Sequence, residues 1–402
     1  MKIVFRSSIA VFLLAVLPAS IAFARTSTPS SSKTTKREGK VAESAHAKKR
    51  MSKLRHSRAT HAGLRRRHRY YERFYTSSFA DDVAAGDITA GEDPIVRQAA
   101  IDALGNMNGT VVAIDPTNGR ILAMVNQKLA LSEGAQPCST IKLAVALAAL
   151  NEQVITPETL VSVGGRSRLD LTEALAKSNN AYFEALGRKL GFEKVSYYAH
   201  QFGLGELASF NIVGEHLGVF PSQELDAKLG GVGKMCSFGE SISMTPLQLG
   251  ALVSAIANGG TLYYLQHPTT PEDILSFQPR VKRQLDIGPL IPEISLGMMG
   301  AVDYGTARSV HLNFNEEQIL GKTGTCSKDG TRFGWFASYA NTQVGHIVTV
   351  VFLQGGRPTF GPKAAEISGR FYRGLYDHKF FTAPATAASR SSSEKSAVGA
   401  QQ

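Results

Sequence analysis

One serine and one lysine stand three residues apart in the stretch from Pro137 to Asn151, at Ser139 and Lys142. An unbroken run of Leu, Ala and Val follows from 143 to 150. These residues are strong helix formers, and a helix that is apolar on all sides lies inside a core. The run is too short to cross a membrane. We therefore expect a buried helix whose functional groups lie in its first turn.

The spacing of this pair favours nucleophilic chemistry. Residues three apart share a helix face, so we expect the Ser139 hydroxyl and the Lys142 amine within hydrogen-bonding reach. Burial and the positive end of a helix both favour the neutral form of the amine. A neutral amine can take the proton of a hydroxyl and make it a nucleophile. By itself the pair is better explained as a chance match in which Ser139 acts as a helix cap, because a motif with two fixed letters is common.

The N-terminus has the layout of an export signal. Lys2 and Arg6 precede an uncharged run from 7 to 24, which ends in small residues at Ala22-Phe23-Ala24. This pattern predicts a secretory signal peptide over residues 1–24 with cleavage after Ala24, and an uncleaved membrane anchor is the alternative. Either arrangement predicts an exported protein, in a periplasm or on the outer face of the cytoplasmic membrane.

Residues 25–90 are predicted to form a disordered basic arm. Between Arg25 and Tyr75 there are 16 Lys and Arg residues against three acidic ones, and aliphatic residues are sparse. Behind an export signal the available polyanions are membrane head groups and the cell-wall polymer, so we expect contacts with these and no nucleic acid. A plain solvated spacer is the other interpretation. A second disordered segment is predicted at the Ala- and Ser-rich residues 381–402.

Residues 91–380 carry the patterns of one folded domain. Two strand-like runs, 109–114 and 120–125, flank a turn rich in Pro, Asn and Gly, which predicts a hairpin. Three further runs, 318–325, 334–340 and 346–353, are predicted to be consecutive antiparallel strands. Helices are predicted from 94 to 105, 169 to 190, 245 to 256, 296 to 304 and 364 to 376.

Two other polar motifs lie in this domain, at Ser178-Asn179-Asn180 and at Lys322-Thr323-Gly324-Thr325. Alone, the first is typical of a helix end and the second of a hairpin edge. Together with Ser139 and Lys142 they match the S-x-x-K, S-x-N and K-T-G signature of penicillin-binding proteins and related β-lactamases. The sequence resembles a penicillin-binding protein transpeptidase domain from about 109 to 353. The segments Thr245-Pro246-Leu247-Gln248-Leu249, Tyr304-Gly305-Thr306-Ala307 and Trp335-Phe336-Ala337 extend the resemblance.

The resemblance implies an α/β (α+β) fold, with a five-stranded antiparallel sheet flanked by helices and an all-helical subdomain. It implies a penicillin-sensitive D,D-transpeptidase that cross-links peptidoglycan stem peptides through a serine acyl-enzyme. Its expected partners are stem peptides, β-lactams and a cell-wall synthesis complex. The implied catalytic residues are Ser139 as nucleophile, Lys142 as base, Ser178 as proton relay, Asn180 and Lys322, with Thr323, Gly324 and Thr325 binding substrate and the backbone N–H groups of Ser139 and Thr325 forming the oxyanion hole.

Other fates of the acyl-enzyme define the alternatives. Water as acceptor gives a D,D-carboxypeptidase or a serine β-lactamase. A β-lactamase with this signature carries a Glu-x-x-Leu-Asn loop, and Glu206, Glu215 and Glu224 lack the Leu-Asn that should follow. We therefore rank transpeptidase first, carboxypeptidase second and β-lactamase third. A non-enzymatic β-lactam or muropeptide sensor is the rival from another class, although we find no signalling domain for it.

The cysteines and histidines limit which disulfides, metal sites and cofactors can be expected. Three cysteines, Cys138, Cys236 and Cys326, are too few for a disulfide scaffold. We expect three buried thiols in preference to one bridge near the active site, which an exported protein would also permit. The ten His residues show no metal-ligand spacing, and no Gly-rich phosphate loop is present, so we expect neither metal nor cofactor.

Overall fold

The computed structural model describes residues 72–342 and 345–382. The predicted signal or anchor, most of the basic arm and the C-terminal tail after residue 382 lie outside the described residues. Phe381, assigned to the disordered tail, is buried in the short 3₁₀ helix Phe380–Thr382. Within them, no helix has the length and apolar character needed to cross a membrane.

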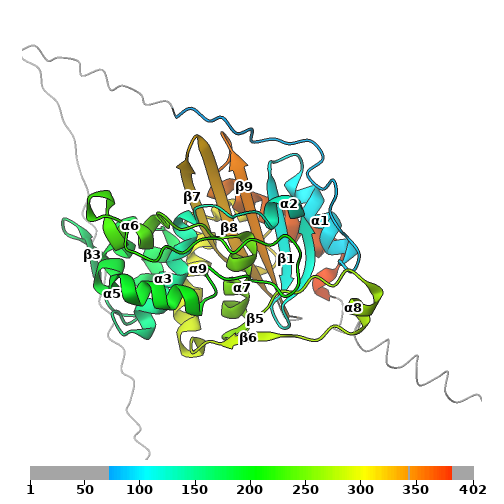
Figure 1. Cartoon of the computed structure of the whole chain (residues 1–402). Helices are drawn as coiled ribbons and strands as arrows, with labels where there is room; N and C mark the ends of the chain where they lie inside the picture. The colour runs from blue at the N-terminus through cyan, green and yellow to red at the C-terminus, as the bar shows by residue number, and fades with distance from the viewer. Residues whose placement is uncertain (1–71, 343–344, 383–402) are drawn as a thin grey trace, which may run out of the picture. The chain divides into compact units, whose positions relative to one another are not determined.

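A five-stranded antiparallel sheet in the order β2-β1-β9-β8-β7 forms the centre of the domain, as the resemblance implies (Figure 1). The predicted hairpin is β1–β2, and the three consecutive C-terminal strands are β7, β8 and β9. Two small hairpins, β3–β4 and β5–β6, lie apart from this sheet. The strands are β1 Gly109–Asp115, β2 Arg120–Val125, β3 Val161–Gly164, β4 Ser167–Leu169, β5 Thr261–Tyr263, β6 Val281–Gln284, β7 Gln318–Lys328, β8 Thr331–Thr342 and β9 Gly345–Gly355.

Helices cover both faces of the sheet, because alternate strand residues on each face are apolar. Even-numbered β9 residues such as Val350 belong to one hydrophobic core with α3, α5 and α7, whereas odd-numbered ones such as Val351 belong to a second core with α1 and α10. The helices are α1 Pro94–Leu104, α2 Gln127–Ala130, α3 Lys142–Asn151, α4 Leu171–Ala176, α5 Asn180–Gln201, α6 Gly231–Phe238, α7 Pro246–Ala257, α8 Pro271–Leu275, α9 Ile291–Asp303 and α10 Gly361–Asp377.

Strand β7 is an edge of the sheet, and this position exposes the K-T-G-T motif to the helical part of the domain. Its residues alternate between the two cores: Leu320 belongs to the core around α3, and Ile319 to the core around α10. Lys322 and Gly324 therefore face the α3 side, while Thr323 and Thr325 face the α10 side. Helices α3, α5 and α6, coloured green in Figure 1, pack together beside the sheet.

The helix predicted over 169–190 is wrong in detail, because it is two helices. Helix α4 ends at Ala176, and α5 begins at Asn180. Asn179 has extended backbone and its side chain accepts the N–H of Tyr182, so it caps α5. Ser178 stands in the connecting turn with φ 54°, in the left-handed region. Gly191, predicted to stop the helix, kinks it instead, and α5 continues to Gln201.

Residues 72–90, which the sequence assigned to the arm, are bonded to the domain. The N–H of Tyr75 donates to the carbonyl of Gly330 at 2.9 Å, and the hydroxyls of Thr76 and Thr331 lie 2.6 Å apart. The Ser78 hydroxyl, which is buried, accepts the N–H of Gly356 at 2.8 Å. We call residues 72–80 the N-terminal strap. Its polar, aromatic composition gave no periodic pattern, so sequence reasoning did not detect it.

Candidate active site

Ser139 lies in a tight turn that opens the buried helix. Cys138–Ile141 form the 3₁₀ helix η1, which continues directly into α3, so the predicted first turn is narrower than an α-helical one. The Thr140 hydroxyl donates to the carbonyl of Pro137 at 2.7 Å and fastens the turn. Between Ala135 and Ile141, all within the described residues, Ser139 alone is not buried. The turn thus presents one hydroxyl to its surroundings.

Lys142 is fully buried, and its amine contacts the turn between α4 and α5. The amine donates to the Ser178 carbonyl at 2.8 Å, the Ser178 hydroxyl at 3.1 Å and Asn180 Oδ1 at 2.7 Å. Within the described residues the Lys142 amine makes these bonds in place of the predicted hydrogen bond to Ser139. Burial, together with the smaller effect of the nearby Lys322 amine, lowers the pKa of Lys142 to about 6. At neutral pH the amine therefore has a lone pair.

Lys322 reaches the same hydroxyl from the sheet. Its amine donates to Ser178 Oγ at 2.8 Å and to the carbonyl of Thr323 at 3.0 Å. Desolvation lowers the pKa of this fully buried Lys322 side chain to about 7. Ser178 Oγ thus lies between two amines, one from the nucleophile's helix and one from the edge strand. A hydroxyl in this position can accept a proton from one neighbour and pass its own to another.

Gly324 allows β7 to approach the nucleophile's turn closely. A Cβ placed on Gly324 would lie 2.9 Å from the Pro137 carbonyl oxygen and 3.3 Å from Cys138 Cβ. We expected this glycine to admit substrate backbone, and the structure supplies a further reason, since the turn itself fills the space. On the other side of the strand, Thr325 Oγ1 accepts the N–H of Gly361 at 2.7 Å, and its proton is left for another acceptor.

The expectation of three free thiols is wrong. Cys138 and Cys326 form a disulfide with a Cα–Cα distance of 5.6 Å, and Cys236 remains a free, buried thiol. Sequence reasoning favoured free thiols because three cysteines are too few for a disulfide scaffold. The bridged pair is 188 residues apart, and only the fold brings η1 and β7 together. Burial raises the pKa of the Cys236 thiol to about 12, so this residue behaves as a small apolar side chain.

The sequence reasoning gave no role to Thr306, although it quoted the Tyr304-Gly305-Thr306-Ala307 segment. The hydroxyls of Thr306 and Thr323 lie 2.5 Å apart, and the Thr306 N–H donates to the carbonyl of Ala176 at 3.2 Å. A Cβ on Gly305 would lie 2.1 Å from the same carbonyl oxygen. This segment therefore connects β7 to the Ser178 turn. The sequence did offer a signal for this contact, namely a glycine flanked by polar residues just after a predicted helix.

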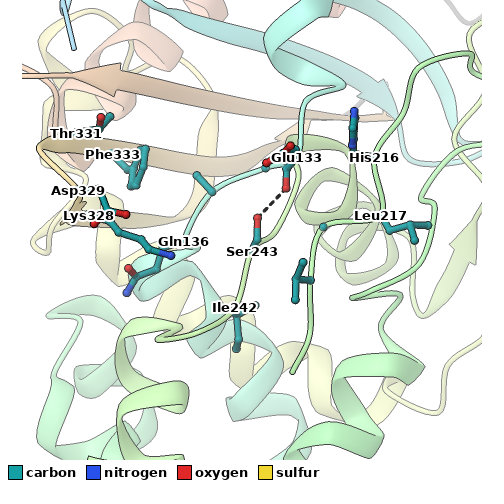
Figure 2. A pocket seen from close by; sticks show the side chains of 14 residues that line it. Glu133, Gln136, His216, Leu217, Ile242, Ser243, Lys328, Asp329, Thr331 and Phe333 are labelled. Carbon is teal, nitrogen blue, oxygen red and sulfur yellow. Dashed lines mark hydrogen bonds between the residues drawn. The ribbon is translucent and has the colours of Figure 1, made fainter. Parts of the chain in front are cut away.

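A pocket of about 570 Å³ adjoins the nucleophile's turn (Figure 2). One wall is the segment from Glu133 to Gln136, which leads into the turn, and another is the tip of the β7–β8 hairpin with Lys328 and Phe333. The Ser243 hydroxyl donates to the Glu133 carbonyl at 2.7 Å across it. Ser139, Lys142, Ser178 and Lys322 do not line this pocket, so it lies beyond these four predicted site residues.

Metal ligands do not converge anywhere in residues 72–342 and 345–382, where no group of three or more His, Cys, Asp and Glu is placed to hold an ion.

Comparison with known proteins decides the family. Residues 109–373 match the model of the penicillin binding protein transpeptidase domain. The chain belongs to this family. The segment matched contains both lysines, the Ser178 turn, the whole of β7 and the disulfide, so every motif quoted above lies within the penicillin-binding transpeptidase domain.

Curated relatives carry related names. The chain is 29% identical over 260 residues to "Stage V sporulation protein D" of Bacillus subtilis, covering 54% of this chain and 39% of the relative. It is 23% identical over 373 residues to "Peptidoglycan D,D-transpeptidase MrdA" of Haemophilus influenzae, covering 71% of this chain and 56% of that protein. The chain therefore spans less than two thirds of the length of these two relatives.

A solved structure supports the fold. The D,D-transpeptidase domain of a peptidoglycan glycosyltransferase from Eggerthella lenta superposes with a TM-score of 0.61 at 21% sequence identity, covering 72% of this chain and 82% of that one. At this identity the likeness concerns the fold alone, and it agrees with the five-stranded sheet and flanking helices of this penicillin-binding domain.

Proposed function

We propose that this chain is a serine-type D,D-transpeptidase that cross-links peptidoglycan stem peptides outside the cytoplasm and is acylated by β-lactams. The observation that carries the proposal is the Ser178 hydroxyl held between the amines of Lys142 and Lys322, beside the turn that presents Ser139. The names of the curated relatives and the family match support the same reaction.

In the first half-reaction, Ser139 Oγ attacks the carbonyl carbon between two D-alanines, and its proton passes to the neutral amine of Lys142. The N–H groups of Ser139 and Thr325 would stabilise the negative oxygen that forms. The C–N bond then breaks, and a proton relayed through the Ser178 hydroxyl reaches the departing amine of D-alanine. An ester on Ser139 remains.

In the second half-reaction, an acceptor amine attacks that ester carbonyl, loses a proton to the same relay, and releases Ser139 with its hydroxyl restored. The charged form of Lys322 would attract the carboxylate of the terminal D-alanine. The hydroxyls of Thr323 and Thr325, predicted to bind substrate as well, contact Thr306 and the N–H of Gly361 on the α10 side of β7. Asn180 holds the Lys142 amine in place through its Oδ1.

Hydrolysis is disfavoured by the positions of the carboxylates that sequence reasoning considered. A β-lactamase needs a carboxylate free to activate water next to the ester. Each candidate is engaged elsewhere: Glu206 with Arg283 at 2.7 Å and Lys282 at 2.8 Å, Glu215 with the N–H of Ala208 at 2.8 Å, and Glu224 with the N–H of Val232 at 3.0 Å. This supports a long-lived ester that waits for an amine.

Labelling with fluorescent penicillin tests the proposal. Wild type should form a covalent adduct that persists for hours, and mass spectrometry of the digested protein should locate it on the peptide containing Ser139. Ser139→Ala should not label. Ser327→Ala is the matched control. Ser327 is an exposed serine on β7, the strand next to the turn that carries Ser139, and this variant should label as wild type does.

Four results would redirect the proposal. Labelling of Ser139→Ala at the wild-type rate would refute the nucleophile. An adduct lost within seconds would indicate a β-lactamase. Labelling without any product from stem peptides and an acceptor amine would indicate a sensor, and release of D-alanine without cross-linked product would indicate a carboxypeptidase.

A further inference from the structure

The disulfide lies between the two parts of the proposed oxyanion site. Cys138 immediately precedes Ser139, and Cys326 immediately follows Thr325, with 5.6 Å between the two Cα atoms. The bridge therefore joins the residues next to the two backbone N–H donors. It is the one covalent link between the nucleophile's turn and the edge strand among the residues described.

The non-covalent contacts near the disulfide fasten the chain before the Ser139 turn, and the disulfide is left to position the turn itself. The indole N–H of Trp335 donates to the Gln136 carbonyl at 3.0 Å, and this fastens the chain before the turn to β8. At the turn itself, Cys138 has φ 51°, in the left-handed region that a non-glycine residue adopts only when its surroundings require it. Gly324 has no side chain with which to hold the turn.

The edge position of β7 makes a covalent restraint useful. A strand at the edge of a sheet has a partner on one side only, so its free side can move relative to the elements across the groove. An oxyanion site needs both donors at a fixed distance from the same oxygen, because stabilisation of the developing charge depends on donors that are already in place.

We infer that the Cys138–Cys326 disulfide is a clamp that sets the spacing of the two oxyanion donors, so that the reaction of Ser139 depends on the oxidised state of this pair. The inference rests on the proposed acyl transfer. Cys138 and Cys326 are positioning residues here, because their sulfurs act through the backbone of Ser139 and Thr325.

Reduction opens the clamp. A water-soluble phosphine breaks the S–S bond, the two sulfurs gain two electrons and two protons to become thiols, and the phosphine becomes its oxide with oxygen from water. Cys138 is fully buried, whereas Cys326 is partly exposed, so the reagent has access from the Cys326 side. Removing one oxyanion donor slows acyl transfer by roughly 10²–10³-fold in enzymes. A loosened pair should cost less, about tenfold.

The test measures acylation by a chromogenic penicillin in the full chain, separating the dissociation constant of the initial complex from the rate of ester formation. Wild type is compared before and after phosphine, together with Cys138→Ser, Cys326→Ser and Cys236→Ser. Rates are normalised to the fraction of protein that labels at completion, so partial unfolding does not imitate a slower reaction. Circular dichroism and a thermal melt report the fold of each sample.

The expected result is a tenfold slower ester formation in reduced wild type and in both bridge variants, with little change in the dissociation constant, and recovery of the wild-type rate after reoxidation. Cys236→Ser should react like wild type and stay sensitive to phosphine. Where a bridge variant does not fold, the rate of ester formation in folded wild type before and after reduction decides whether the disulfide sets the reaction rate.

Two outcomes overturn the clamp while leaving the acyl transfer in place. In one, reduced wild type forms the ester as fast as oxidised wild type and only its melting temperature falls, so the bridge serves stability alone. In the other, reduction accelerates the reaction, so the bridge restrains the enzyme. Failure of oxidised wild type to label at all refutes the proposed function, and the clamp with it.

Discussion

Two buried amines share one hydroxyl at the centre of this site. Lys142 and Lys322 have no exposed surface, and both contact Ser178 Oγ. Desolvation is the main reason why both pKa values lie well below 10.5, and at Lys142 repulsion from the nearby Lys322 amine acts in the same direction. The arrangement supplies a base at neutral pH without histidine.

The pH dependence of acylation follows from these two pKa values. Lys142 must be neutral to accept the serine proton, so the rate should rise as pH increases through about 6. Lys322 must be charged to attract the substrate carboxylate, so the rate should fall as pH increases beyond about 7. We expect a bell-shaped profile of kcat/KM, measured with a D-alanyl thioester between pH 5 and 9. A profile that is flat across this range would contradict the assigned roles.

An isosteric change at Asn180 tests the base directly. Asn180 Oδ1 lies 2.7 Å from the Lys142 amine, so Asn180→Asp places a negative charge against it. An opposite charge at this distance raises the pKa of an amine by roughly one to three pH units, so the acid limb of the profile should move to higher pH by that amount.

Asn179→Asp is the matched control for this change. The Asn179 side chain caps α5 through the N–H of Tyr182, and aspartate caps a helix equally well. Its profile should stay close to that of wild type. An equal shift in both variants would show that any added charge near the start of α5 is sufficient, and would remove Asn180 as the specific partner of Lys142.

At the scale of the elements, short turns position the site. The Ser178 turn lies between α4 and α5, and the turn after α9 braces it against β7 through Gly305 and Thr306. The turn that carries Ser139 is braced by the disulfide, and Gly324 lets β7 approach that turn closely. Each brace joins segments far apart in the chain, and each relies on a residue small enough for close approach.

Gly305→Ala tests the brace behind the Ser178 turn. The added methyl group would lie 2.1 Å from the Ala176 carbonyl oxygen, so the backbone must move. We expect a loss of about 1–3 kcal/mol in the free energy of unfolding. Acylation should also slow severalfold, because the displaced turn carries Ser178. Chemical denaturation and penicillin labelling measure the two effects.

Gly288→Ala serves as the comparison, since a Cβ there would lie at an ordinary 3.4 Å from the carbonyl oxygen of Gly259. It should change neither quantity appreciably. Loss of stability in Gly305→Ala with an unchanged acylation rate would show that the segment supports the fold without positioning the site.

At the scale of the described domain, the sheet separates two hydrophobic cores, and the N-terminal strap fastens the ends of strands β8 and β9. The strap contacts Gly330 and Thr331 at the hairpin tip and Gly356 after β9. Just after it, the Asp87 carboxylate binds Arg97 at 3.0 Å and the N–H of Gln127 at 2.8 Å. These buried partners belong to the domain although they precede its predicted start.

Two truncated chains test this boundary. A chain that begins at residue 72 should keep the stability of the longer protein, whereas one that begins at residue 91 loses the strap and Asp87. Arg97 then keeps its ion pair with Glu92 but loses the one with Asp87, and the strap's partners lose their hydrogen bonds, which should together cost about 1–3 kcal/mol in the free energy of unfolding. Equal melting temperatures for the two chains would show that the contacts of residues 72–90 contribute little.

Local patterns in the sequence were enough to predict much of the secondary structure of this domain. The hairpin at β1–β2, the three C-terminal strands and the helix at Pro246 follow from alternation, turn residues and capping, which act between near neighbours. The buried helix at Lys142 follows from its unbroken apolar run. The three motifs also pointed to the correct family, because their residue types serve one chemistry.

Tertiary structure alone decided how these pieces meet. The hydrogen bonds of Lys142 with the Ser178 turn, the disulfide between residues 188 positions apart, the brace at Thr306 and the strap on the hairpin tip all join distant segments. Local propensity carries no information on such contacts, because their free energy appears only when both partners are buried together in the folded chain. The residue types determined which chemistry is available, and the packing determined which atoms perform it.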